Sequence, residues 1–309
     1  MTGARGERMQ LPDAAGIMRP VRRTLLMTPG DRPDYVDRAR AAAADVVWLD
    51  LEDGVDASRK ADARRIVGSA LAADWACREL LVRVNAVAEG GLDDISAVLA
   101  RGRPDGIVLS KVESADEVVA AAEAVRSAGA GSLPLWLMIE TPRAVLDVDG
   151  IAAASGLVTA LVFGAGALIR ELGMTRGDDG GYPDGLHYAE SRTVLTARAR
   201  GLSAITGSYP RTNDPEGMRA HALRSFAIGF DGVLLVSPVQ IGAAHAAWAP
   251  SPEEIADAGR LLAGLAGLRG ADRSVGTVDG RAMIVDAQAA SAELVLARGR
   301  IADRDAATP

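Results

Sequence analysis

The chain has 309 residues, of which 49% are hydrophobic, and its formal net charge is −7. This length and composition allow one barrel-sized core or two smaller cores. The acidic balance argues against a general nucleic-acid or anionic-membrane binder, and it leaves room for a local basic site that takes an anionic substrate.

The cysteine content and the hydropathy pattern predict a protein of the reducing cytoplasm. Cys77 is the single cysteine, which excludes an intrachain disulfide and a cysteine-based zinc cluster. The sequence contains no uncharged apolar run of about 18 residues, the length that a membrane helix needs. Residues 1–20 carry charges and lack the apolar core of a signal peptide, so we expect them to form a flexible arm.

Eight short apolar segments follow the arm, and each leads into a helical pattern. The predicted strands are residues 24–28, 46–51, 80–84, 106–109, 135–139, 158–163, 202–205 and 232–236. The predicted helices are residues 31–44 with Asp31 as the cap, 58–73, 92–100, 114–128, 144–154, a long helix that ends near residue 200, 215–228 and 252–268. Eight such units over about 250 residues are typical of a TIM barrel, which we expect over residues 21–268.

The segment 46–55, VVWLDLEDGV, predicts a strand that is buried on both faces and ends in acids. Its carboxylates are Asp50, Glu52 and Asp53, and burying them together is unfavourable without a metal, a cation or hydrogen bonds. The segment therefore indicates a functional site. Alternatively, Asp50 caps a loop while Glu52 and Asp53 are solvated turn residues.

Polar residues recur where later strands end, and this favours the functional interpretation. They are Arg83 with Asn85, Lys111 with Glu113, and Glu140. In a TIM barrel, catalytic groups come from the carboxyl-terminal ends of several strands. We therefore predict that Glu52, Arg83 and Glu140 meet in one site.

Residues 269–309 form a tail beyond the predicted barrel. The tail has a glycine-containing turn, a short apolar patch, Asp286, and a helix that we expect to end near residue 297. A segment that cannot bury itself usually docks on its own domain or on a partner subunit. We expect a lid or an oligomerisation tail, and either placement can bring Asp286 to the barrel end.

Seven segments in order along the chain resemble the citrate lyase beta-subunit-like branch of the HpcH/HpaI aldolase superfamily. They are RRTLLMTPGDRP (22–33), WLDLEDGV (48–55), VRVN (82–85), GIVLSKVES (106–114), IETPRAVL (139–146), LVFGA (161–165) and residues 229–241. The resemblance implies a trimeric or hexameric TIM barrel that makes or breaks a carbon–carbon bond next to a carbonyl. The implied substrates are citryl, malyl or citramalyl thioesters of coenzyme A, or a related oxoacid.

The resemblance also implies roles for individual residues. A magnesium ion would use Glu140 and an aspartate after the sixth strand, while Arg83 binds the substrate carboxylate and carbonyl. Glu52 would order water, metal or base, and Asp286 would act as an acid–base group in a neighbouring subunit's site. The predicted substrate-binding residues are Pro29, Arg83, Asn85 and Lys111. These roles agree with the chemistry of carbon–carbon cleavage, because a cation stabilises the enolate and an arginine guanidinium binds a carboxylate through two hydrogen bonds.

The sequence departs from this family pattern after the sixth strand. Where the family has a Gly-Ala-Glu-Asp-Leu type run, residues 164–168 are Gly-Ala-Gly-Ala-Leu, so Ala167 stands at the metal-binding aspartate. Thr206 and Ser237 replace a common aspartate and a common histidine after the seventh and eighth strands. The loss of one of two protein carboxylates predicts weaker magnesium binding.

Three hypotheses for the function remain open. The first is a carbon–carbon lyase or aldolase that uses magnesium and a coenzyme A thioester or an oxoacid. The second is a metal-independent member of the family in which Arg83 and Lys111 stabilise the enolate. The third is a non-catalytic ligand-binding or partner subunit that has inherited the fold.

Overall fold

The computed structural model of the chain describes residues 9–12, 18–177, 180–270, 275–278, 282–285 and 288–306. These residues divide into two compact units. One consists of residues 22–244, and the other contains residues 9–12, 18–21 and the described residues after Ala244. The division thus comes before residue 268, the predicted end of the barrel domain, because α11 (Pro252–Gly270) packs against α12 (Ala289–Ala306) in the second unit.

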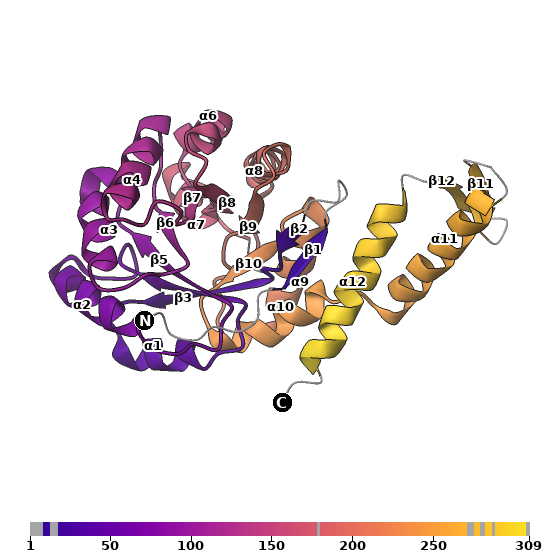
Figure 1. Cartoon of the computed structure of the whole chain (residues 1–309), viewed down its shortest axis with the longest axis horizontal. Coiled ribbons are helices and arrows are strands. Elements are labelled where there is room, and N and C mark those ends of the chain that lie inside the picture. The colour runs from indigo at the N-terminus through magenta and orange to yellow at the C-terminus, as the bar shows by residue number, and fades with distance from the viewer. Residues whose placement is uncertain are drawn as a thin grey trace. The chain divides into compact units, whose positions relative to one another are not determined.

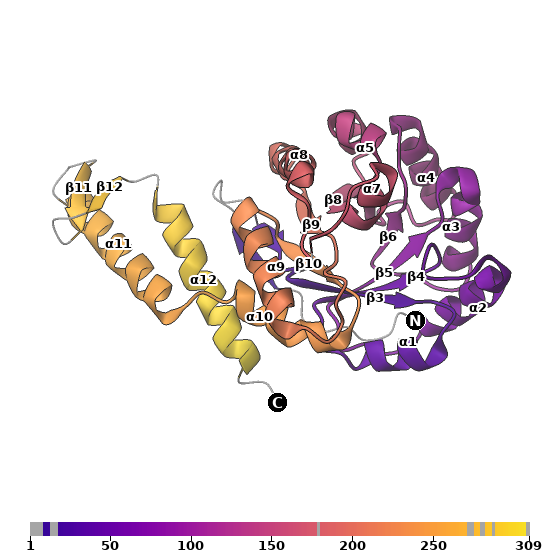
Figure 2. The same cartoon turned by 180° about the vertical axis from the view of Figure 1, so that it is seen from behind.

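The first unit is a closed barrel of eight parallel strands, drawn from two opposite sides in Figures 1 and 2. The strands are β3 (Thr24–Pro29), β4 (Val46–Asp50), β5 (Glu79–Val84), β6 (Gly106–Leu109), β7 (Leu135–Ile139), β8 (Val158–Phe163), β9 (Ser203–Thr206) and β10 (Gly232–Leu235). They pair in sequence order, and β10 closes the barrel against β3. The TIM barrel predicted from the sequence is therefore confirmed.

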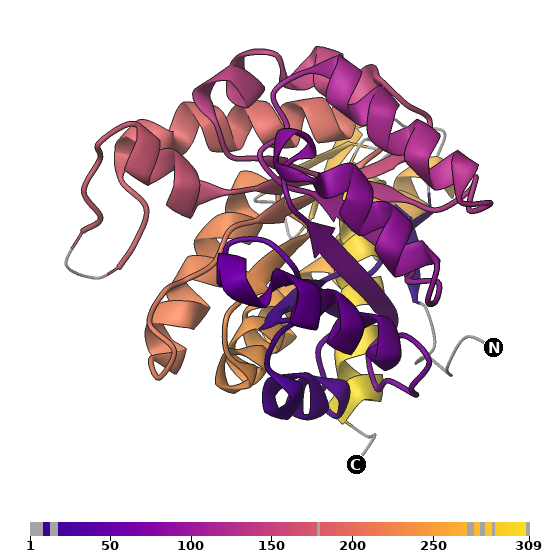
Figure 3. The ribbon, with the colours of Figure 1, turned by 90° about the vertical axis from the view of Figure 1, so that its left-hand side faces the viewer.

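Helices follow the strands and cover the outside of the barrel. They are α1 (Pro33–Arg40), α2 (Lys60–Ala70), α3 (Gly91–Leu99), α4 (Ala115–Ser127), α5 (Pro142–Leu146), α6 (Val148–Ala153), α7 (Ala165–Glu171), α8 (His187–Ala199) and α9 (Pro215–Ile228), while the division between the two units falls within α10 (Ile241–Trp248). Helices α2, α3 and α4 pack side by side, as the purple and magenta ribbons of Figure 3 show.

Two helix predictions differ from the structure in detail. Asp31 was expected to cap the first helix, but that helix has Arg32 at its N-cap, and the carboxylate of Asp31 accepts a hydrogen bond from Arg59 at 2.7 Å. The helix expected over residues 144–154 is split into α5 and α6, because Asp147 between them has a φ of −113° and leaves the helical conformation.

The barrel interior is a packed apolar core, and its geometry decides where the site lies. Along β4, β5, β7 and β8, the core residues nearest the carboxyl ends are Trp48, Leu81, Met138 and Val162. Side chains alternate between the two faces of a strand, so the next inward positions are two residues further on. Those positions are Asp50, Arg83, Glu140 and Gly164.

Buried ion pairs close the opposite, amino-terminal end of the barrel. The guanidinium of Arg22 donates two hydrogen bonds to the carboxylate of Glu79, at 2.9 and 2.8 Å, and a third to Ser203 at 3.0 Å. Arg23 likewise donates from its side chain to both oxygens of Asp45, at 2.8 and 2.7 Å. All these side chains are buried, and they are hydrogen-bonded to one another.

The second unit contains two short antiparallel sheets and a helix pair. Strand β1 (Gln10–Pro12) pairs with β2 (Met18–Pro20), and β11 (Val275–Val278) pairs with β12 (Ala282–Val285). The segment expected to be a flexible arm therefore contains paired strands, whose three-residue length is too short for an alternating pattern to predict. In the part of the chain that the structure describes, no helix is long and apolar enough to cross a membrane.

Candidate functional site

Arg83 and Asp50 lie next to each other at the base of the site because β4 and β5 pair with these two residues in register. The Nε and Nη2 atoms of Arg83 donate to the two carboxylate oxygens of Asp50 at 2.6 and 2.7 Å. The guanidinium also lies over the Trp48 ring, 5.1 Å from its centroid. Burial lowers the pKa of Arg83, but the charges of Asp50 and Glu52 outweigh it and raise the pKa above its ordinary value. Arg83 is therefore a fixed cation.

Asp50 also organises the turn that carries Glu52. Its carboxylate accepts the backbone N–H groups of Glu52 and Gly54, each at 2.9 Å. The suggestion that Asp50 caps a loop is thus confirmed, while its pairing with Arg83 was missed. Alternation along β4 puts Asp50 on the same face as Trp48, two residues earlier, but it does not identify Arg83 as the partner.

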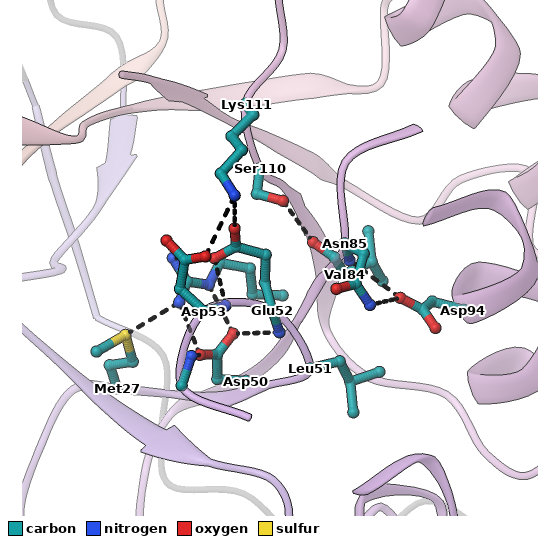
Figure 4. Close-up of polar contacts among 12 residues, drawn as sticks. Met27, Asp50, Leu51, Glu52, Asp53, Val84, Asn85, Asp94, Ser110 and Lys111 are labelled. Atoms are coloured by element: carbon teal, nitrogen blue, oxygen red, sulfur yellow. Dashed lines mark hydrogen bonds and ion pairs between the residues drawn. The ribbon is translucent and has the colours of Figure 1, made fainter. Parts of the chain in front are cut away.

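Glu52 is a buried acid that two cations flank, and Figure 4 shows it beside Asp53 and below Lys111. Its Oε1 lies 2.6 Å from the Lys111 Nζ, and its Oε2 lies 3.2 Å from the Arg83 Nη1. Burial raises the pKa of Glu52, although both cations oppose the shift. The alternative that Glu52 is a solvated turn residue is therefore wrong, whereas Asp53 is exposed at its side chain.

Lys111 joins the acids of two strands. Its backbone N–H donates to the Glu140 Oε1 at 2.8 Å, and its ammonium reaches Glu52 and, at 3.2 Å, Asp53. Among the described residues, it alone has a positive φ without being a glycine, with a value of 48°. This left-handed conformation is uncommon for a long side chain, so the surrounding contacts hold it in place.

Glu140 is only 5% exposed and lies against β8. Burial raises the pKa of Glu140 to about 7, although Arg83 and the Lys111 N–H oppose the shift. Gly164 provides the space for this side chain, because a Cβ at residue 164 would lie 2.2 Å from the Glu140 Cβ and 2.7 Å from its Oε2. The position therefore tolerates only glycine while Glu140 keeps this place.

Asn85 lies beside the site, but its side chain is occupied by structural contacts. Its amide donates to Asp94 at 2.5 Å, and its carbonyl oxygen accepts from the Lys60 Nζ at 2.8 Å. The same ammonium donates to the backbone carbonyls of Leu51 and Glu52, both at 2.7 Å. Lys60 and Asn85 thus hold the Glu52 turn in place. Pro29, also predicted to bind substrate, ends β3 next to Asp50 in register.

The structure therefore brings Glu52, Arg83, Lys111 and Glu140 together at one end of the barrel, as the sequence predicted. Residues 23–238 match the HpcH/HpaI aldolase/citrate lyase family. The chain belongs to this family.

Characterised relatives of the family match most of the chain. A (3S)-malyl-CoA thioesterase of Cereibacter sphaeroides is 37% identical over 262 residues, which cover 84% of this chain and 88% of that protein. An L-malyl-CoA/beta-methylmalyl-CoA lyase of Rhodobacter capsulatus is 32% identical over 271 residues, which cover 79% and 84%. A crystal structure of protein CitE from Mycobacterium tuberculosis, in complex with magnesium, acetoacetate and coenzyme A, has a TM-score of 0.76 and 31% identity, and the match covers 90% of this chain and 98% of CitE.

The donors of this chain do not make the two-carboxylate magnesium site that the family pattern implies. Glu140 is a suitable ligand, but Ala167, in the first turn of α7, has no side-chain oxygen. No group of three or more His, Cys, Asp or Glu side chains with metal-binding spacing occurs within the described ranges. At Gly166, the residue before Ala167, a Cβ would lie 4.0 Å from the positively charged guanidinium of Arg176.

Asp286 lies outside the described residues, so its predicted role stays a prediction. His221 is buried against the rings of Tyr182 and Tyr209, and its Nε2 lies 3.1 Å from the Gly207 carbonyl oxygen. His221 is therefore a packing residue of the barrel.

Proposed function

We propose that this protein is a carbon–carbon lyase that cleaves or forms a carboxylated hydroxyacyl thioester of coenzyme A, or a hydroxy-oxoacid, through an enolate. The observation that carries the proposal is the clamp between Asp50 and Arg83. It fixes the guanidinium at the strand ends, and within the described residues the Nη1 edge is paired with Glu52 at the longer distance of 3.2 Å. A substrate carboxylate can displace Glu52 there without disturbing the clamp.

The cleavage of a β-hydroxyacyl thioester requires few groups from the protein. The hydroxyl group loses its proton, and the bond between the hydroxyl-bearing carbon and the carbon next to the thioester breaks. The electron pair moves onto the thioester carbonyl as an enolate, which is then protonated on carbon. Arg83 binds and orients the carboxylate, Glu52 orients the water or base that takes the hydroxyl proton, and positive charge near the enolate oxygen lowers the barrier.

The proposal includes a second subunit. Asp286 would supply acid–base chemistry to the site of a neighbouring copy in a homotrimer or homohexamer. This part rests on family resemblance, and light scattering of the purified protein tests it. A monomer at assay concentration, with full activity, would contradict it.

A second candidate is hydrolysis of the same class of thioester. The similarity to (3S)-malyl-CoA thioesterases, at up to 37% identity, favours it. In this case water attacks the thioester carbonyl, the bond from carbon to sulfur breaks, and the hydroxyacid leaves with its carbon chain intact. Arg83 would bind the same carboxylate in both reactions.

Product analysis with (3S)-malyl-CoA distinguishes the candidates. Lyase activity yields acetyl-CoA and glyoxylate, whereas hydrolysis yields malate and free coenzyme A. We expect the lyase products from wild type and their loss in Arg83→Ala, while Arg65→Ala, which removes an exposed arginine on α2, stays active. Binding of malyl-CoA without any product would favour the non-catalytic hypothesis instead.

A further inference from the structure

The chain contains only two lysines, Lys60 and Lys111, although arginine is abundant. Both ammonium groups contact the Glu52 turn: Lys60 binds its backbone carbonyls, and Lys111 binds its carboxylate. An ammonium is a compact charge that can donate in three directions, while a guanidinium is a planar fork. The only two lysines of the chain, which carry the more compact cation, thus both contact the Glu52 turn.

The backbone of Lys111 directs this cation into the site. Its φ is 48°, and its N–H donates to Glu140. Figure 4 shows that its side chain points to Glu52 and Asp53. Lys111 thus connects Glu140, which follows β7, with Glu52 and Asp53, which follow β4. A backbone held in a sparsely populated conformation at a functional cluster is typical of a residue whose position matters for the chemistry.

The ammonium of Lys111 is also the more accessible of the two cations that flank Glu52. Its side chain is 28% exposed, against 7% for Arg83. The contacts with Glu52 and Asp53 occupy two of its three N–H groups within the described part of the chain. Burial lowers the pKa of Lys111, but the two carboxylates outweigh it and raise the pKa, so the group stays charged. A charged ammonium is an electrostatic group and not an amine nucleophile.

We propose that Lys111 is a catalytic residue whose ammonium binds the enolate oxygen while Arg83 holds the substrate carboxylate. Its positive charge stands in for the divalent cation whose second ligand is missing at Ala167. The two cations already flank one carboxylate, that of Glu52, through its separate oxygens, so their spacing suits the oxygens of one small anionic substrate. The inference rests on the proposed function for the identity of that anion as an enolate.

The test separates the ammonium from the unusual backbone. Lys111→Gly and Lys111→Asn both tolerate a positive φ and keep the N–H that binds Glu140, so they remove only the charged side chain. Arg65→Ala is the matched control, because it removes an exposed cation from the same half of the barrel. Thermal unfolding of each variant shows whether the fold is retained.

The first measurement is calorimetric binding of oxaloacetate and pyruvate in the presence of EDTA. Wild type and Arg65→Ala should bind the oxoacid without metal, and the two Lys111 variants should bind at least about tenfold more weakly, since one charged hydrogen bond is lost. Lack of binding by wild type in EDTA, restored by magnesium, would overturn the proposal. So would trapping of a pyruvate adduct on Lys111 by borohydride.

The second measurement is turnover of (3S)-malyl-CoA by the same variants. Because the negative charge on the oxygen grows in the transition state, loss of Lys111 should lower kcat by about 10²–10³ and change KM much less. Variants with kcat within twofold of wild type would overturn the proposal. If wild type turns over no thioester but still shows the Lys111-dependent oxoacid binding, the lyase assignment fails and the role of Lys111 in anion binding stands.

Discussion

Asp50 and Arg83 form a two-point ion pair, Nε to Oδ1 at 2.6 Å and Nη2 to Oδ2 at 2.7 Å, between side chains that are 0% and 7% exposed. Breaking one side of such a buried pair leaves an uncompensated charge. The same carboxylate holds the Glu52 turn through two backbone N–H groups. Stability and the geometry of the site therefore depend on one carboxylate.

We predict that Asp50→Asn lowers the free energy of unfolding by about 3–5 kcal/mol, because the buried Arg83 guanidinium loses its two-point counter-charge and is left with the longer contact to Glu52. Urea denaturation followed by circular dichroism measures the change. Asp34→Asn is the matched control, since Asp34 pairs with Arg38 at a similar 2.8 Å on the exposed face of α1. It should lose no more than about 1 kcal/mol. Equal losses in the two variants would contradict the assigned role of the buried pair.

The pairing of Asp50 with Arg83 also marks the limit of what the sequence could predict. The eight strands were found because each apolar run is short and ends in polar or turn residues, and barrel topology then places Glu52, Arg83 and Glu140 at one end. Which residue of β4 meets which residue of β5 depends on register, which no local pattern records. The sequence therefore indicated that Asp50 belongs to a functional site or caps a loop, but it did not identify Arg83 as its partner.

The conformation of Lys111 lies beyond sequence analysis for a related reason. Its positive φ is stabilised by a hydrogen bond to Glu140, 29 residues further along the chain, and by ion pairs with Glu52 and Asp53. Intrinsic preference alone would assign this backbone to glycine or asparagine. Tertiary contacts overrule the local preference, as is common at functional sites.

Gly164 is predicted to be intolerant of any side chain. A Cβ would lie 2.2 Å from the Glu140 Cβ, so Gly164→Ala must displace the buried acid or the end of β8. We expect a loss of about 1–3 kcal/mol in the free energy of unfolding, measured by urea denaturation, together with loss of activity. Gly166→Ala, two residues away, is the control, because its nearest neighbour would be 4.0 Å distant and alanine favours a helix. A stable, active Gly164→Ala variant would refute this account of the Glu140 position.

The stability of the barrel should fall on acidification because of His221. Burial first, and then the charges of Arg224 and Arg176, lower its pKa to about 4 from the ordinary value of 6.5. The unfolded chain thus takes up a proton below pH 6.5 that the folded chain takes up only near pH 4. The free energy of unfolding decreases across that window, by at most about 3 kcal/mol from this group.

His221→Gln should remove this part of the pH dependence, since glutamine stays neutral and can still donate to the Gly207 carbonyl. Urea denaturation at several values between pH 4 and 7 gives the two curves. The variant should show a flatter curve than wild type, while His187→Gln, which removes an exposed histidine, should keep the wild-type slope. Parallel curves for wild type and His221→Gln would show that other groups cause the acid sensitivity.

Ala167→Asp is predicted to create a magnesium site. The substitution places a second carboxylate after β8, next to the strand end that carries Glu140, and magnesium prefers carboxylate and water ligands in an octahedron. In calorimetry with oxaloacetate present, wild type should bind magnesium weakly and Ala167→Asp at least about tenfold more tightly, since one charged ligand is gained. Ala167→Asn has the same shape without the charge and should remain close to wild type. Tight magnesium binding by wild type would mean that Glu140 and the oxoacid oxygens suffice, and Lys111 would then not be needed as a replacement cation.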